Sequence, residues 1–448
     1  MSNNYNFSRN ALLKRIGLAP ANKLTVFLVS LVVVTIPLSY IYNSLAIIFF
    51  VLYSILAARM VNVSLRVSLL LPVSLFALMA LSLFWTIDIK SSLMALSKEA
   101  SVLCIPLSFM LHRRLPQSSV NNVLKNYTTT MCLIGFYIIC RAIFRFIFLG
   151  EGTGVFFEDE LSINQINIVY LSAFFSLAFF VFIGKKNKTF WGYLAMYFLL
   201  IIILLLSSKI TIFVNIILIF SYYLFAHGLT RKTRFTSILS SAVIVILIGY
   251  TSGLYNKYVY EIQPLKTTQG EESYVTINQA WNNNYFSDKD KFTAISFRVY
   301  QARIFKEMIT QEPILFTGYG LNASKLKVKQ KGIEHNVVHT DEDGNRYSLL
   351  NFHNQYIEAF ADLGILGFVF TVLLVLINLI MAIRSKYFVH IAFAILMISL
   401  FLTESFLWRQ RGVVFFTLFY CLFNSLLPVN FMDKYVDKTI KKPGVAKA

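Results

Sequence analysis

Long apolar runs constrain this chain more than any other feature of its sequence. Many stretches reach the roughly 17–25 residues that a helix needs to cross a bilayer, with few or no charges inside them. Hydrophobic residues make up 57% of the 448 residues and charged residues only 14%, against about 25% in a soluble domain. We therefore predict an all-α polytopic membrane protein.

The placement of basic residues gives the expected orientation of the spans. Short clusters such as His112-Arg113-Arg114 and Arg231-Lys232-Thr233-Arg234 separate the apolar runs, as in cytoplasmic loops under the positive-inside rule. With a cytoplasmic N-terminus and alternating spans, every basic cluster falls inside. The net charge of +19 then needs no nucleic-acid partner. The first run lacks a following cleavage site and is interpreted as a retained span. About twelve transmembrane helices are predicted, at 24–42, 44–58, 67–85, 93–111, 127–149, 166–184, 190–206, 210–227, 235–251, 363–383, 387–403 and 412–428.

The same alternation divides the chain into three parts. Residues 1–251 are predicted to form an N-terminal bundle of about nine helices, and residues 252–362 one large extracytoplasmic loop domain. Residues 363–448 supply about three further helices and a basic cytoplasmic tail. The loop is nearly charge-balanced, since residues 252–352 hold 12 Lys or Arg and 11 Asp or Glu. This balance distinguishes the loop from the basic cytoplasmic connections.

Inside the loop, apolar residues recur at helical spacing from Phe297 to Ile309, which predicts an amphipathic helix ended by Pro313. Residues 325–331 and 341–345 are interpreted as solvated loop. We expect His335 and His339, in this flexible region, to be dispensable.

A lone histidine stands where the loop returns to the membrane. His353 precedes an apolar span, and an imidazole suits proton transfer near neutral pH. At helical spacing His353 shares a face with Tyr356, and Gly364 and Gly367 lie deeper and permit close contacts. His353 is therefore expected to face the bundle, either as a catalytic group or as a residue that caps the helix.

Several cations are predicted on the same outer face. Arg298 opens the loop helix, and its planar guanidinium suits a diphosphate. Lys209 lies in the short connection after the seventh span, and Arg303 is interpreted as a solvated surface charge. Glu404 is expected to neutralise one of the two arginines that follow it. Further cations that bind lipid phosphate or extend to the interface are Arg141, Arg145, Arg409 and Arg411.

The chain shows no nucleotide-binding loop and no residues at metal-ligand spacing, so neither a cofactor nor a metal is expected. An enzyme outside the cytoplasm must then use an already activated substrate. A lipid diphosphate fits, because it partitions into the bilayer and leaves as an anion that cations stabilise.

These features resemble the O-antigen ligase and polymerase family of bacterial envelope glycosyltransferases. The resemblance rests on His353-Asn354-x-Tyr356 with Asp362-Leu363-Gly364-x-x-Gly367, on Ser296-x-Arg298, on Pro313 with Gly318-x-Gly320, and on Ser208-Lys209. It implies an inverting, metal-independent transfer of a glycan from undecaprenyl diphosphate to a hydroxyl of lipid A core. It places such a multi-pass enzyme in the bacterial inner membrane, with its active site on the periplasmic face.

The resemblance also implies roles for single residues. His353 matches an essential histidine and Arg298 a diphosphate-binding arginine, while Asn354 and Tyr356 become substrate or support residues. At Lys209 the chain departs from the family, which usually has Arg there, and Lys lacks the bidentate fork.

Two alternatives stay open. A polymerase of the same family would transfer to another glycan repeat unit with the same motifs. A lipid-linked glycan flippase would share the topology but should carry charges along a central pathway, and only Lys98-Glu99 lies deep in a span.

Overall fold

The computed structural model describes residues 22–58, 66–163, 166–185, 187–225, 230–251, 273–337, 347 and 351–426. Each of the twelve predicted apolar ranges contains a helix. The N-terminal elements are α2 (Asn22–Thr35), α3 (Tyr40–Ala58), α4 (Val67–Leu81), η1 (Ser82–Phe84), α5 (Ile89–Met110), α6 (Gln117–Phe148), η2 (Thr153–Phe156), α7 (Glu158–Leu161), α8 (Ile168–Ile183), α9 (Phe190–Leu205), α10 (Lys209–Phe225) and α11 (Arg231–Thr251). The C-terminal elements are α16 (Gln355–Ser385), α17 (Phe388–Thr403), η4 (Phe406–Trp408) and α18 (Gln410–Asn424).

The membrane character of the helices is confirmed, but the number of spans is not. Among the described residues, five helical segments are long and apolar enough to cross a membrane: α3, α4 with η1, α5, α6 and α16. Helices α2, α8, α9, α10 and α17 are apolar but shorter. The count of about twelve spans therefore stays a prediction.

Two helices form the centre of the bundle. In α8 13 of 16 residues are buried, and in α18 14 of 15. Both contact helices on several sides: α8 packs against α6, α9, α10 and α17, and α18 against α4, α5 and α16. A helix that is apolar on all faces is stable only when neighbours surround it, as these two are.

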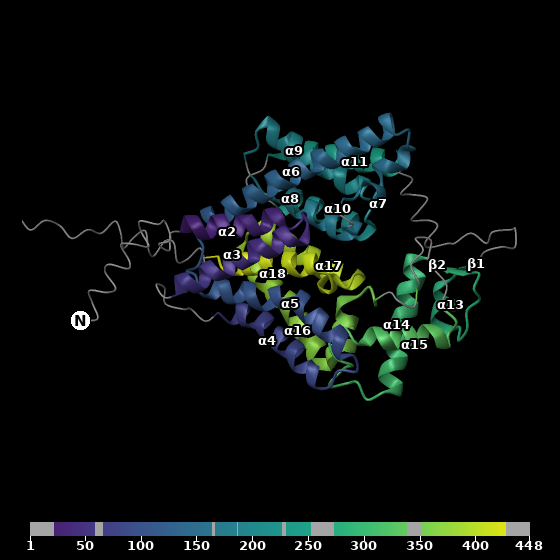
Figure 1. Cartoon of the computed structure of the whole chain (residues 1–448). Coiled ribbons are helices and arrows are strands. Elements are labelled where there is room, and N and C mark those ends of the chain that lie inside the picture. Colours follow the sequence, from purple (N-terminus) through teal and green to yellow (C-terminus); the bar gives the residue numbers. More distant parts are fainter. Residues whose placement is uncertain are drawn as a thin grey trace, which may run out of the picture.

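The residues between α11 and α16 include a small subdomain with its own core at one end of the bundle (Figure 1). It contains β1 (Ser273–Val275), α13 (Ile277–Asn282), β2 (Asp290–Phe292), α14 (Ala294–Gln311) and α15 (Ser324–Glu334), and its two short strands pair in parallel. Buried aromatic side chains, among them Phe286 and Tyr300, fill the core. The predicted amphipathic helix is thus confirmed as α14.

Three expectations within this subdomain are wrong. Residues 325–331 belong to helix α15, because Val328 and Gly332 give that segment a buried side. Arg303 is buried rather than solvated, and its guanidinium binds Glu307 (Nε to Oε1, 2.8 Å) and Asn284 (Nη2 to Oδ1, 2.7 Å).

His335 is likewise buried. Its ring lies 3.2 Å from the Tyr300 hydroxyl and 3.3 Å from the Glu307 carboxylate. Burial lowers the pKa of His335, although the charge of Glu307 opposes that shift. The expectation that His335 lies in a flexible loop is therefore wrong, whereas its dispensability for transfer stays a prediction. His339 and residues 341–345 lie outside the described residues.

Helix α16 is broken at Gly364, where the backbone has φ 68° and ψ −163°. The break leaves a short half-helix at 355–363 before the long apolar part. A loop from α14 fills the break: the amides of Tyr319 and Gly320 donate to the carbonyls of Ala361 and Asp362 at 2.9 and 2.8 Å. Broken helices persist at membrane depth only where neighbours satisfy the freed backbone groups in this way.

The glycines at this junction permit backbone-to-backbone contact. A Cβ at Gly318 would lie 2.4 Å from the carbonyl of Asp362, and one at Gly364 2.4 Å from the carbonyl of Phe316. Gly318 and Gly364 therefore let the loop and the broken helix pack backbone against backbone, whereas a Cβ at Gly367 would meet Ala359 and Leu363 of its own helix.

Candidate functional site

His353 lies in the turn that leads into the half-helix. Asn354 is the N-cap, and its side-chain oxygen accepts from the amides of Tyr356 and Ile357 at 3.0 and 3.1 Å. The helix begins only at Gln355, so His353 does not share a helical face with Tyr356 as predicted. His353 instead has φ 46°, a left-handed conformation that is uncommon outside glycine and that His adopts more readily than most residues.

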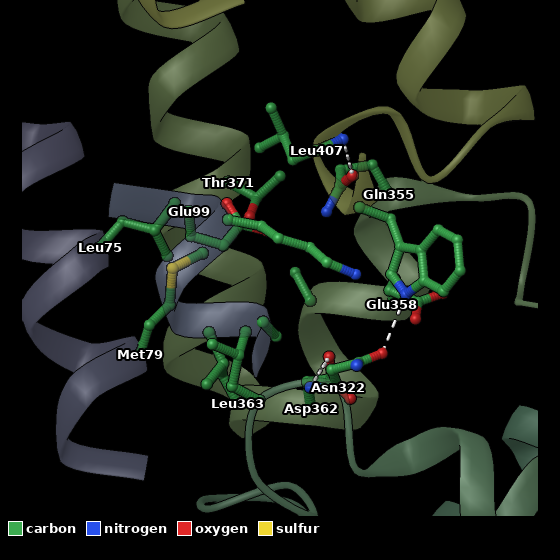
Figure 2. Close-up of a pocket in the computed structure, with 15 residues that line it drawn as sticks. Leu75, Met79, Glu99, Asn322, Gln355, Glu358, Asp362, Leu363, Thr371 and Leu407 are labelled. Atoms are coloured by element: carbon green, nitrogen blue, oxygen red, sulfur yellow. Dashed lines mark hydrogen bonds between the residues drawn. The ribbon is translucent and has the colours of Figure 1, made fainter. Parts of the chain in front are cut away.

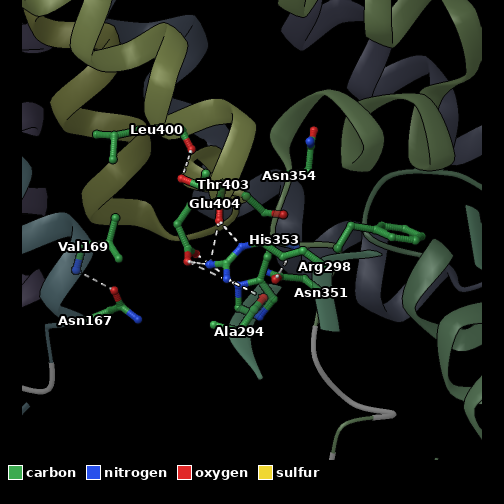
Figure 3. A network of polar contacts seen from close by, with 12 residues as sticks. Asn167, Val169, Ala294, Arg298, Asn351, His353, Asn354, Leu400, Thr403 and Glu404 are labelled. Atoms are coloured by element: carbon green, nitrogen blue, oxygen red, sulfur yellow. Dashed lines mark hydrogen bonds and ion pairs between the residues drawn. The ribbon is translucent and has the colours of Figure 1, made fainter. Parts of the chain in front are cut away.

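Glu404 joins His353 to Arg298. It follows the last residue of α17, and its carboxylate oxygens lie 3.3 and 3.4 Å from His353 Nδ1. Arg298 Nη2 lies 3.3 Å from the same carboxylate, as Figure 3 shows. Three elements far apart in the sequence (α14, the turn before α16, and the end of α17) thus meet at one carboxylate.

The ionisation of Glu404 determines which nitrogen of His353 carries the proton. Burial acts to raise the pKa of Glu404, but the hydrogen bond and charge of His353, with the charges of Arg298 and Arg409, bring it below its ordinary value. An ionised carboxylate can only accept, so Nδ1 of His353 must donate. Within the described residues Nε2 has no hydrogen-bond partner, and the side chain is 24% exposed. The free Nε2 lone pair can therefore accept a proton from a substrate.

Arg298 is largely engaged in holding the end of α17. Its Nε and Nη2 both donate to the carbonyl of Thr403 at 3.1 Å, and Nη1 donates to the carbonyl of Ala294 at 2.9 Å. With the Glu404 contact, four of its five donors are used. The Arg298 side chain remains 34% exposed, so it presents positive charge to the outside of the cluster.

The other predicted cations divide into two groups. Arg145 pairs with Glu151 and with Glu160, whose Oε2 lies 2.6 Å from Nη2. Arg141 donates to the carbonyl of Ser162 at 2.6 Å. These two arginines tie the loop that follows α6 to its helix, which is a structural role.

At the start of α18 the two arginines differ. Arg411 is buried, donates to the carbonyl of Leu38 at 3.1 Å, and lies over the ring of Tyr40. Arg409 is exposed, and no described residue forms an ion pair or hydrogen bond with its side chain, although its charge acts on Glu404. Arg409 is thus the more available cation beside the cluster.

Lys209 is the first residue of α10 and takes no part in the contacts of His353, Arg298 and Glu404. Asn354 and Tyr356 hold the half-helix against α17: Asn354 donates to the carbonyl of Leu402 at 3.1 Å, and Tyr356 stacks edge-on against Phe401.

The sequence prediction missed the direct partners of Glu404. The charge of Arg409, one of the two arginines that follow it, does act on Glu404, but the ion pairs of its carboxylate are with Arg298 and His353. An acidic residue directly after an apolar span was the available signal, but its partners lie 106 and 51 positions away. Among the described residues, no group of three His, Cys, Asp or Glu side chains has the geometry to hold a metal ion.

In a comparison with protein families, the family model described as O-antigen ligase matches residues 194–372, which run from α9 into α16. The match includes Lys209, Arg298 and His353, whereas Glu404 and Arg409 lie beyond it. A comparison with curated proteins finds no match. Residues 194–372 are therefore similar to the O-antigen ligase family, in agreement with the resemblance of the sequence.

Proposed function

We propose that this protein is an O-antigen ligase-type glycosyltransferase. It moves a glycan from undecaprenyl diphosphate to a hydroxyl of lipid A core, on the periplasmic face of a bacterial inner membrane. The observation that carries the proposal is the single carboxylate of Glu404 between His353 and Arg298. It gives an oriented base a cationic neighbour at the edge of a membrane bundle, within a chain that matches the O-antigen ligase family model over residues 194–372.

In the proposed reaction, Nε2 of His353 takes the proton of the acceptor hydroxyl as that oxygen attacks the anomeric carbon of the donor. The bond from the anomeric carbon to the diphosphate oxygen breaks, and undecaprenyl diphosphate leaves with the electron pair. The anomeric configuration is inverted, because the attack and the departure occur on opposite sides. Glu404 stabilises the imidazolium that forms, as the acid of a catalytic triad does.

The developing charge on the leaving diphosphate requires cations. Arg298 and Arg409 flank Glu404 and are the proposed partners of the diphosphate. Lys209 is a further candidate from the family pattern. The displacement needs no metal in this mechanism, because the cations and the base supply the charge stabilisation and the proton transfer.

The test is transfer in vitro from a lipid-diphosphate glycan, in the presence of a chelator. His353→Ala should lower the rate by about 10²–10⁴-fold, the usual contribution of a positioned base. Arg298→Ala should lower it by about a hundredfold or more, as for a removed transition-state donor. Lys329→Ala, an exposed cation of α15, is the control and should transfer normally. Full transfer by His353→Ala, or loss of transfer with the chelator, would contradict the mechanism.

The length of the glycan chains on lipopolysaccharide from a deletion strain identifies the acceptor. Loss of all long glycan chains supports the ligase. Core that carries a single repeat unit would identify a polymerase with the same chemistry.

A further inference from the structure

A second polar site lies inside the bundle, next to η4, which follows Glu404 in the chain. It is a cavity of about 30 Å³ between α4, α5, the half-helix of α16 and η4 (Figure 2). Since one water needs about 10–15 Å³ of such space, the cavity has room for about two. Its polar lining residues are Lys98, Glu99, Asn322, Gln355, Glu358 and Asp362.

Hydrogen-bonding groups in this lining lack partners among the described residues. Glu99 is 94% buried, since its exposed fraction is 6%, and its Oε2 has no hydrogen-bond partner. A buried polar atom without a partner is energetically unfavourable, so a ligand that donates a hydrogen bond to it would be favoured. Figure 2 shows Glu99 at the cavity with Thr371 and Leu75 on either side.

The lining also contains hydrogen-bond donors that have no partner among the described residues. Gln355 and Asn322 each use the side-chain oxygen, accepting from the amide of Leu407 at 2.7 Å and from Trp408 Nε1 at 2.9 Å. Their amide nitrogens form no bond within the described part of the chain. The amine of Lys98 lies 5.9 Å from the ring centre of Trp408. The cavity therefore offers unused donors and unused acceptors together, next to an indole ring.

The lining does not suit a phosphate. Lys98 supplies its one cationic side chain among the described residues, whereas several cations gather at the His353 cluster and would attract an anion there. The carboxylates also do not form a metal-ion group. Hydroxyl groups suit the mixture, because each one both donates and accepts.

The cavity shares two chain segments with the proposed catalytic pair. Glu358 Oε2 accepts from the amide of Phe352 at 3.1 Å and from the hydroxyl of Ser405 at 3.0 Å. Phe352 directly precedes His353, and Ser405 directly follows Glu404. A group bound in the cavity thus lies beside the segments that carry the base and its carboxylate.

We propose that this cavity is a subsite for a neutral sugar of the acceptor glycan. Two hydroxyls, or one hydroxymethyl group, replace the water in the cavity and bind Glu99, Gln355 and Asn322, while the sugar ring lies against Trp408. This subsite rests on the proposed glycosyl transfer and adds to it a binding place for the acceptor, separate from the cations that bind the donor.

Intrinsic tryptophan fluorescence of the purified full-length protein in detergent tests the subsite without any transfer reaction. The probes are methyl glycosides of glucose, galactose, mannose and N-acetylglucosamine, with inorganic diphosphate as the anionic comparison. We expect at least one glycoside to change the emission saturably. Trp408→Phe should abolish that change, because Trp408 is the reporter beside the cavity.

Glu99→Gln should raise the dissociation constant of that glycoside about tenfold or more, because an amide nitrogen replaces one of the two carboxyl oxygens that bind the hydroxyls. Lys98→Met, on an exposed side chain at the edge of the cavity, provides a second variant that spares the buried packing, and it should also weaken binding. Asp288→Asn, an exposed acid of the subdomain, is the matched control and should bind normally. In transfer assays Glu99→Gln should raise the KM for the acceptor while kcat and the KM for the donor stay within about twofold.

Two results distinguish this inference from the proposed function. If no glycoside changes the emission up to its solubility limit, and Glu99→Gln leaves the acceptor KM unchanged, the subsite is wrong while the transferase stands. If glycosides bind but the wild-type protein transfers no glycan, the proposed function is wrong while the sugar site stands.

Discussion

Glu404 is the residue on which the proposed base depends. Its carboxylate accepts from Nδ1 of His353, which leaves Nε2 to take the proton of the acceptor hydroxyl. Its burial is tolerated because His353, Arg298 and Arg409 compensate its charge. Removing the charge should therefore affect both the chemistry and the stability.

Glu404→Gln should lower kcat, since the imidazolium that forms during transfer loses the anion that stabilises it. Glu404→Asp should recover part of the rate. The stability of the protein depends on the same carboxylate. Its folded-state pKa is lowered, so its contribution to stability is present above the unfolded pKa of about 4.3 and is lost as pH falls through the folded value. Thermal melting of Glu404→Gln should accordingly depend less on pH below about 5 than melting of the wild type. An unchanged kcat in Glu404→Gln would show that Glu404 does not position His353.

At the scale of elements, the break in α16 decides where the functional residues lie. The half-helix at 355–363 carries Glu358 and Asp362 toward the cavity, and the turn before it carries His353. The break is held by backbone contacts between Gly364 and the loop at Gly318, which tolerate no side chain. The two sites therefore share one structural support.

Gly364→Ala should destabilise the protein by about 3 kcal/mol or more, because a left-handed backbone costs 1–2 kcal/mol and the added Cβ overlaps the backbone of Phe316. Gly150→Ala is the matched control: its φ of +66° is similar to the +68° of Gly364, but nothing lies within 4 Å. It should cost only the backbone strain, about 1 kcal/mol. Thermal melting in detergent measures both, and equal losses would mean that the close contact at Gly364 does not matter.

At the scale of the whole molecule, the orientation in the membrane follows from the basic loops. The subdomain lies at one end of the bundle (Figure 1), and its helix α14 carries Arg298, which contacts Glu404 together with His353. Arg113 lies in the connection from α5 to α6, where the positive-inside rule predicts the cytoplasm.

Single-cysteine labelling from outside the cell tests this orientation, in a background without the four native cysteines. Cysteine at Asn283, exposed in the subdomain, should react with an impermeant reagent. Cysteine at Arg113, exposed between α5 and α6, should react only after the membrane is permeabilised. The reverse pattern would put the proposed site in the cytoplasm and remove the proposed function.

The helices and the position of the candidate base could be predicted from the sequence. Hydropathy is a local property, so apolar runs such as 166–184 and 387–403 mark α8 and α17 to within a few residues. The helical spacing of apolar residues from Phe297 to Ile309 likewise predicted α14. The position of a titratable side chain at a membrane boundary identified His353 as the candidate base. Those features depend on residues that are close together in the chain, so they can be predicted from the sequence.

The packing of the helices determines which groups meet. Glu404 directly contacts Arg298 and His353, whereas Arg409 acts on it through its charge. Arg303 is buried against Glu307, and α16 and η4 supply residues that line the cavity with Glu99. A charged side chain near a membrane has several possible partners at similar sequence distance, and the packing of the helices determines which one its charge reaches. The candidate base could therefore be predicted from the sequence, whereas the carboxylate that orients it could be identified only from the fold.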